Sequence, residues 1–136
     1  MSHSRDLDIL FSRLWQDYSS LNPIASRIYG LLAAKGEVIL NDHVAFRTFR
    51  HPKIGLSRLA EPFLRYGYTE KDEYHFTEKK LYARHLEHED TSLPKVFISE
   101  LKVEEFPKEF QYQIMGLLEQ VPGDWSARPD FLWSGR

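Results

Sequence analysis

The stretch that decides the fold is Asn41–Phe49, NDHVAFRTF, which lies within a β-branched and aromatic run that starts at Val38. Such a run predicts a β-strand. Side chains alternate across a strand, so His43, Ala45 and Arg47 should share one face. This polar pair has two interpretations. It is either the solvated face of an edge strand, or a site with a metal-capable imidazole and a guanidinium placed for an anion.

The sequence before this strand predicts two helices. From Asp6 to Ser20, apolar residues recur at helical spacing and form one apolar face. Asn22 and Pro23 then provide a cap and a proline at the first helical position, and the second helix should continue to Gly36. We therefore expect an N-terminal helical hairpin over residues 5–36.

One more helix and three more strands follow the first strand. Ser57 is the expected cap of a third helix that ends at Gly67, and Pro62 is awkward inside it because proline removes a helical hydrogen bond. Alternating or strongly apolar patterns then predict the remaining strands. These strands begin at Tyr68 and cover Lys79–His88 and Lys95–Leu101.

A fourth helix is predicted from Phe106 to Leu118, with Pro107 in its first turn. From residue 37 to 102 the order is strand, helix, strand, strand, strand, which is a βαβββ unit. Helices outside a mixed sheet place the chain in the α+β class. We expect a single domain made of N-terminal helices over 5–36, the βαβββ unit over 37–102, and a C-terminal helix and tail over 103–136.

Composition excludes several classes of function. The 136 residues include 18 basic and 20 acidic side chains with the two signs interspersed, so neither a nucleic-acid stripe nor a polybasic membrane anchor is indicated. Cysteine is absent, which excludes disulfides and thiolate chemistry and fits a reducing cytoplasm. No stretch has the length of a membrane span and Met1–Asp6 has no apolar signal core. These features predict a soluble, cytoplasmic domain.

Several motifs together resemble a known family. The βαβββ unit is the building block of the vicinal oxygen chelate superfamily, in which two such units form a curved sheet around a divalent metal. Within it, the sequence is similar to the 2-oxoadipate dioxygenase/decarboxylase family, some members of which have been known as a domain of unknown function or as provisional hydrolases. The stretches that carry the resemblance are Asn41–Phe49, Glu73–Phe76, Lys79–Leu81 and Pro94–Leu101.

The resemblance implies an enzyme that acts on a 2-oxo acid with O2 and releases CO2. Its Fe(II), or another divalent metal, would be held by two histidines and one carboxylate. His43 matches the first histidine, and Arg47 matches the arginine that holds a substrate carboxylate, for which a guanidinium is well suited. Four residues along a strand separate the two backbones by roughly 13 Å, which leaves room for a substrate between them.

The resemblance covers only one βαβββ unit, that of the N-terminal half. In the family the second histidine and the metal-binding glutamate come from a second unit. Within this sequence Glu100 is the best local candidate for a carboxylate ligand, against the interpretation that it is an ordinary strand-end residue. His85 and His88 fall on opposite faces of their strand and are interpreted as solvated, although His85 and Glu87 share a face and remain an alternative.

Three hypotheses therefore stay open. The chain is half of an Fe(II)-dependent 2-oxo acid dioxygenase/decarboxylase, inactive without the missing C-terminal half. Alternatively, it is a non-catalytic βαβββ module that forms a homodimer, which could bring two His43 and two Glu100 residues to a two-fold axis. In the third hypothesis, Arg47 binds a small anionic ligand without metal. In all three the partner is a small molecule or another such unit, and no nucleic acid or membrane is expected.

Overall fold

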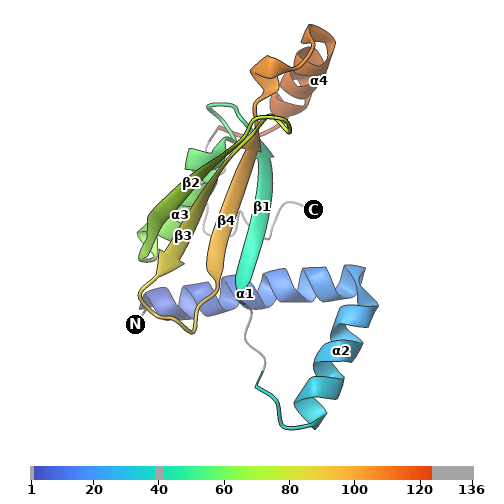
Figure 1. Ribbon diagram of the computed structural model, residues 1–136, viewed down its shortest axis with the longest axis vertical. Coiled ribbons are helices and arrows are strands. Elements are labelled where there is room, and N and C mark those ends of the chain that lie inside the picture. The colour runs from blue at the N-terminus through green and yellow to red at the C-terminus, as the bar shows by residue number, and fades with distance from the viewer. Residues whose placement is uncertain (1, 39–41, 124–136) are drawn as a thin grey trace. The chain divides into compact units, whose positions relative to one another are not determined.

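The computed structural model describes residues 2–38 and 42–123 (Figure 1). These residues fall into two compact units, one with two helices and one that begins at Asp42. The first unit contains α1 (Ser2–Leu21) and α2 (Pro23–Ala34). The second contains β1 (His43–Phe49), α3 (Leu56–Arg65), β2 (Tyr68–Phe76), β3 (Leu81–His88), β4 (Lys95–Leu101), the 3-10 turn η1 (Val103–Glu105) and α4 (Lys108–Leu118). Within the described ranges, no helix is long and apolar enough to cross a membrane.

The two predicted N-terminal helices are confirmed, although α2 turns away from α1 and does not run back along it (Figure 1). Pro23 opens α2 as predicted, but the Asn22 side chain makes no cap bond to α2 and instead donates to the Tyr18 carbonyl at 3.1 Å. The rings of Trp15 and Tyr29 pack at 5.5 Å between centroids and join the two helices. Gly36 follows α2 with φ of 83°, a left-handed conformation that glycine adopts without strain.

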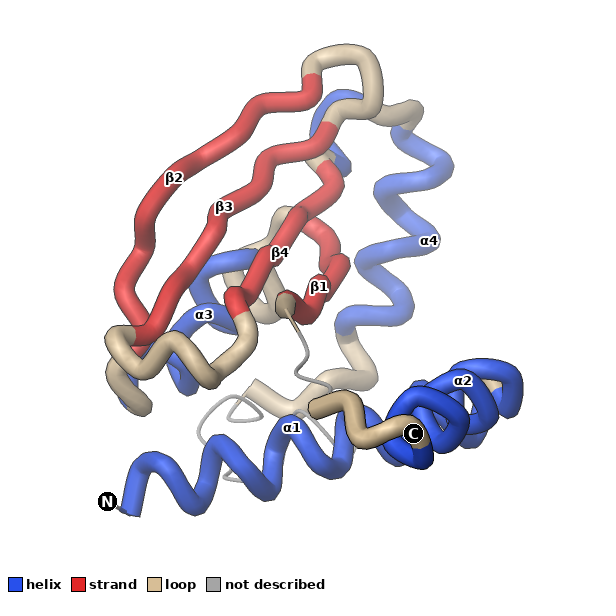
Figure 2. Tube along the Cα trace, turned by 60° about the horizontal axis from the view of Figure 1, so that its bottom comes forward, coloured by secondary structure: helices blue, strands red, loops and turns tan. Residues whose placement is uncertain are grey.

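The four strands form one mixed sheet in the order β1-β4-β3-β2 (Figure 2). β1 pairs parallel with β4, whereas β4 with β3 and β3 with β2 pair antiparallel. This is the predicted βαβββ unit, and its α+β class is confirmed. Because β4 lies between β1 and β3, it brings side chains far apart in the sequence onto neighbouring positions of one sheet.

The core lies between the sheet and α3, which covers one face (Figures 1 and 2). Phe63 of α3 is fully buried and packs against the rings of Phe46 and Tyr68, each at 5.6 Å. From the sheet, Leu86 and Ile98 are also fully buried. Each such side chain contributes about 1.5–3 kcal/mol by leaving water, so this layer holds the unit together.

Several predicted boundaries are wrong for identifiable reasons. The third strand begins at Leu81 and not at Lys79, because Lys80 has φ of 55° in the preceding turn. The cap position of α3 is Gly55 and not Ser57, because a distant carboxylate takes over the capping role. Pro107 precedes α4 and does not lie in its first turn. β1 begins at His43, and residues 39–41 and the aromatic tail from residue 124 lie outside the described residues.

Candidate functional site

The predicted alternation along β1 is confirmed. His43, Ala45 and Arg47 are exposed, whereas Val44 and Phe46 between them are partly covered on the side that faces α3. The two polar residues therefore share the face of the sheet opposite α3, here called the His43 face. On geometry alone, both of the initial interpretations, polar strand face and binding site, still fit this arrangement.

His43 has a carboxylate partner in its own sequence neighbour. Its Nδ1 lies 3.3 Å from Oδ2 of Asp42, and the imidazole is 65% exposed. A carboxylate at one ring nitrogen fixes the ring orientation and leaves the other nitrogen, Nε2, for a ligand. This is the usual arrangement of a metal-binding histidine, although a solvated pair looks the same. His43 is thus suited to provide one ligand.

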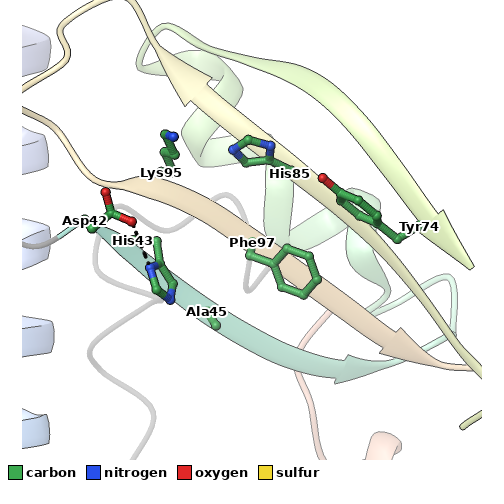
Figure 3. A pocket seen from close by; sticks show the side chains of 7 residues that line it. All are labelled: Asp42, His43, Ala45, Tyr74, His85, Lys95 and Phe97. Carbon is green, nitrogen blue, oxygen red and sulfur yellow. Dashed lines mark hydrogen bonds and ion pairs between the residues drawn. The ribbon is translucent and has the colours of Figure 1, made fainter. Parts of the chain in front are cut away.

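A hollow of about 360 Å³ lies beside His43 on the same face (Figure 3). All four strands contribute to its lining, which consists of Asp42, His43, Ala45, Tyr74, His85, Lys95 and Phe97. Sheet register explains this assembly, since His43 pairs with Lys95 and Phe97 pairs with both Ala45 and His85. The hollow has an apolar middle and a polar rim, the general character of a small-molecule site.

The rim opposite His43 carries a second histidine with a carboxylate. Nε2 of His85 lies 3.3 Å from Oε1 of Glu87, and Nζ of Lys95 lies 3.6 Å from the same oxygen. The side chain of His85 is 19% exposed, so the interpretation of His85 as a solvated residue is wrong. His88 is not simply solvated either, because its Nε2 lies 3.0 Å from the Tyr66 carbonyl and its Nδ1 accepts the Asp90 N–H.

Arg47 lies farther along β1, beyond the lining of this hollow. It pairs in register with Ser99 of β4 and is exposed. Within residues 2–38 and 42–123, no carboxylate is paired with its guanidinium, so this cation is available for an anion from solution. The structure therefore places His43 and Arg47 on one face of β1 with Ala45 between them, as the alternation predicted.

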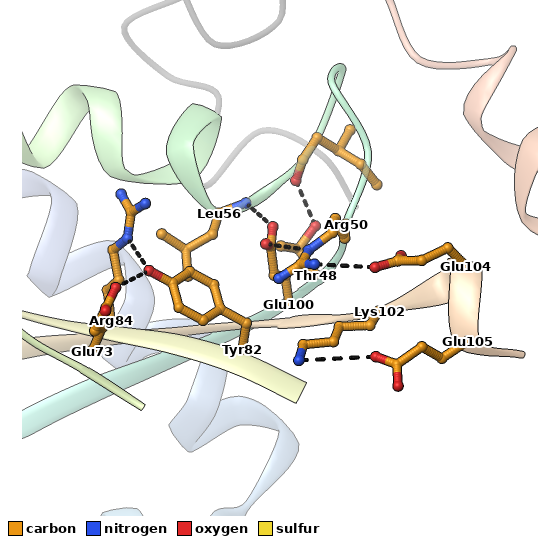
Figure 4. Close-up of polar contacts among 11 residues, drawn as sticks. Thr48, Arg50, Leu56, Glu73, Tyr82, Arg84, Glu100, Lys102, Glu104 and Glu105 are labelled. Carbon is orange, nitrogen blue, oxygen red and sulfur yellow. Dashed lines mark hydrogen bonds and ion pairs between the residues drawn. The ribbon is translucent and has the colours of Figure 1, made fainter. Parts of the chain in front are cut away.

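Glu100 does not join His43, and its role as a metal ligand beside it is not supported by the structure. It lies on the α3 side of the sheet and is 8% exposed (Figure 4). Its Oε1 accepts a hydrogen bond from Nε of Arg50 at 2.9 Å, and its Oε2 accepts the Leu56 N–H at 2.8 Å. Both carboxylate oxygens are therefore used to hold the start of α3. Alternation along β4 puts Glu100 and Phe97 on opposite faces, which decides the point.

The ligand set for a metal is incomplete in the part of the chain that the structure describes. No group of three or more histidine, aspartate or glutamate side chains is arranged there to hold a metal ion. The imidazole of His43, with its Asp42 partner, fits the chemistry of one ligand to a divalent metal. The described unit on its own does not fit the two-histidine, one-carboxylate set.

The sequence predicted His43 and Arg47 as candidates but did not predict most of the hollow beside His43. Tyr74, Lys95 and Phe97 reach the hollow because of strand register, which a single sequence does not specify for distant strands. The role of Asp42 could have been inferred from the sequence, because a carboxylate next to a histidine commonly orients its ring.

The fold defines a structural class. A crystal structure from Ralstonia eutropha JMP134, provisionally named a glyoxalase superfamily protein, matches with a TM-score of 0.75 and 20% identity. The match covers 96% of this chain and 43% of that chain. The mixed four-stranded sheet with its flanking helices is thus a glyoxalase-like, vicinal oxygen chelate fold.

The family follows from the sequence match. The model of the 2-oxoadipate dioxygenase/decarboxylase family matches residues 22–121, and the chain belongs to this family. Relatives of that name from Oryza sativa, described as chloroplastic/amyloplastic, and from Arabidopsis thaliana, described as chloroplastic, are each 35% identical. The alignments cover 75% and 77% of this chain but 31% and 32% of the relatives. The chain therefore spans about a third of their length.

Two further solved structures support the assignment. One, from Shewanella frigidimarina NCIMB 400 and provisionally named a hydrolase, is 48% identical with a TM-score of 0.88, covering 96% of this chain and 51% of that chain. The other is a hydroxyglutarate synthase from Oryza sativa in complex with 2-oxoadipate, 32% identical with a TM-score of 0.81, covering 88% and 42%. The resemblance inferred from the sequence is confirmed for both family and fold.

Proposed function

We propose that this chain provides one half of the active site of an Fe(II)-dependent 2-oxo acid dioxygenase/decarboxylase. In this proposal His43 is one metal ligand and Arg47 binds a carboxylate of the acid, and a second βαβββ unit supplies the other ligands. The observation that carries it is the exposure of His43 and Arg47 on one face of the sheet, beside a hollow, in a chain of this family.

Each residue has a defined task in this proposal. Arg47 offers parallel N–H donors that match the two oxygens of a carboxylate and so orient the acid along the His43 face. Asp42 accepts from Nδ1 of His43 and keeps Nε2 of that ring free as a ligand atom. The apolar side chains of Ala45 and Phe97 line the middle of the hollow, between the polar residues of its rim. Bound iron would supply the redox chemistry with O2.

The first test is binding of 2-oxoadipate to the whole chain by isothermal titration calorimetry. Charge-assisted hydrogen bonds contribute about 1.5–3 kcal/mol each, so Arg47→Ala should weaken binding by about tenfold or more. Arg65→Ala is the matched control, because Arg65 lies in α3 on the other side of the sheet. Unchanged binding in Arg47→Ala would remove Arg47 from the site.

The half-site character is tested by oxygen consumption with 2-oxoadipate and Fe(II). We expect no sustained consumption by the monomeric chain, since the described residues lack a three-ligand cluster. Turnover by a monomer, as established by light scattering, would contradict the requirement for a second unit. In that case the chain would be a complete enzyme.

A ligand-binding role without metal is the second candidate. It is favoured by the same absence of a three-ligand cluster among the described residues. Its signature would be 2-oxoadipate affinity that depends on Arg47 and is the same with and without added divalent metal.

A further inference from the structure

His85 lines the same hollow as His43 but has no task in the proposed site. It comes from β3, on the far side of β4 from His43, and its ring is turned onto the His43 face (Figure 3). Its side chain is 19% exposed, which is low for a histidine on the exposed side of a small sheet. The ring therefore faces the hollow and is only partly exposed to solvent.

Glu87 determines which ring nitrogen of His85 is available. Nε2 of His85 lies 3.3 Å from Oε1 of Glu87, within ion-pair distance, so Nδ1 is the ring nitrogen left for another partner. When the ring is protonated both nitrogens carry an N–H, so Nδ1 can donate to a ligand while Nε2 stays paired with Glu87. The hollow is therefore flanked by two carboxylate-held imidazoles, with Asp42 behind His43 and Glu87 behind His85.

Lys95 and a protonated His85 are the two groups on this side of the hollow that can attract an anionic ligand. Lys95 of β4 and His85 share the carboxylate of Glu87, and these three groups by themselves carry one net positive charge when His85 is protonated. From β2, Asp72 pairs in register with His85, and Tyr74 lines the hollow beside it. On the other side of the hollow lie His43 of β1 and Asp42, which immediately precedes β1; Asp42 and Asp72 each add a negative charge near the hollow.

We propose that His85 is a second ligand-contacting residue of this hollow, donating from Nδ1 to an oxygen of a small carboxylic acid, and that Glu87 is its positioning residue. The proposal rests on the proposed function for the class of ligand, a 2-oxo acid. It adds a contact on the side of the hollow opposite His43, made by a strand other than the one that carries Arg47. Binding of the acid should then favour proton uptake by His85.

The test is calorimetric titration of 2-oxoadipate into the whole chain at pH 6 and pH 8. Wild type should bind more tightly at pH 6, and His85→Gln should weaken binding there by about tenfold and flatten the dependence on pH. Glu87→Gln should also weaken binding at pH 6 and should change the imidazole nitrogen shifts of His85 from those of a ring protonated at Nε2. His75→Gln is the matched control, because His75 contacts Tyr82 on the other face of the sheet.

Outcomes for this inference and for the proposed function differ. If Arg47→Ala weakens binding but His85→Gln behaves like His75→Gln, the role of His85 is overturned and that of Arg47 stands. If His85→Gln weakens binding and Arg47→Ala does not, the role of His85 stands and that of Arg47 is overturned. If wild type binds 2-oxoadipate at neither pH, both are overturned. Nuclear magnetic resonance of the wild type gives a check without substitution, since the His85 ring nitrogens must shift when the acid is added.

Discussion

Glu100 is a buried carboxylate that holds several parts of the βαβββ unit together. Its carboxylate joins three parts of the fold, because it lies in β4, receives Arg50 from the loop after β1, and accepts the N–H of Leu56 at the start of α3. The same guanidinium reaches Glu104 at 3.0 Å, but that carboxylate is 52% exposed (Figure 4). A negative charge at a helix N-terminus also interacts favourably with the helix dipole.

Replacing Glu100 should therefore destabilise the protein strongly. Glu100→Ala leaves a buried N–H without its acceptor and Arg50 without its better-buried partner, at a cost of about 2–4 kcal/mol in the free energy of unfolding. Glu104→Ala, the matched control, should cost less than about 1 kcal/mol because exposed pairs are weak. Urea denaturation measures both. Equal effects of the two substitutions would contradict the assigned role.

Tyr68 should make stability sensitive to alkaline pH. Burial, and to a lesser degree the charge of Asp90, raise the pKa of its hydroxyl, which donates to the Pro94 carbonyl at 2.8 Å. The folded state therefore holds this proton more tightly than the unfolded state, whose pKa is about 10. The stabilisation is present below that value and is lost above it, by about 1.4 kcal/mol per pH unit.

Thermal unfolding between pH 9 and 11 measures this effect. Tyr68→Phe should be less stable than wild type at pH 9, by about 1 kcal/mol for the lost hydrogen bond, but should lose less on going to pH 11. Tyr112→Phe serves as the control. Tyr112 is 69% exposed, so loss of its hydroxyl should leave the pH dependence of stability as in wild type. An unchanged slope in Tyr68→Phe would assign the alkaline loss to other groups.

At the scale of elements, the start of α3 requires a glycine for steric reasons. A Cβ on Gly55 would lie 2.7 Å from the His51 carbonyl oxygen and 3.1 Å from Oε2 of Glu100. Gly55→Ala should therefore displace the loop or the capping carboxylate and lower stability by about 1–3 kcal/mol. Gly116→Ala in α4 is the opposite case, since no atom of the described residues lies within 4 Å of the added Cβ and the helix should gain about 0.5–1 kcal/mol. Chemical denaturation of the two variants should show opposite signs.

Most elements were predictable because their signals are local. Helical spacing in α1, proline at the start of α2 and the apolar run of β4 each act within a few residues. The cap of α3 was not predictable in this way, because the group that accepts the Leu56 N–H is Glu100, 44 residues further along the chain. The same limit applied to the site. Alternation predicted that His43 and Arg47 share a face, whereas the hollow depends on which strands become neighbours.

For the whole molecule, metal binding should depend on association. Functional transition-metal sites generally use at least three protein ligands, and among the described residues no group of three is arranged to hold one. The chain also spans only about a third of the curated relatives. We therefore expect the monomer to lose Fe(II) on desalting, with iron content and light scattering measured on the same sample.

If the chain forms a dimer, iron retention should differ from that of the monomer. A two-fold axis would present two copies of the Asp42-held His43 ring, so retained iron should rise with the dimer fraction as the protein is concentrated. His43→Ala should then abolish that retention, and His75→Ala, on the other face of the sheet, should leave it intact. Iron that stays with a monomer and survives His43→Ala would show that the metal is held elsewhere. The assignment of His43 as a ligand would then fail even if Arg47 still bound the acid.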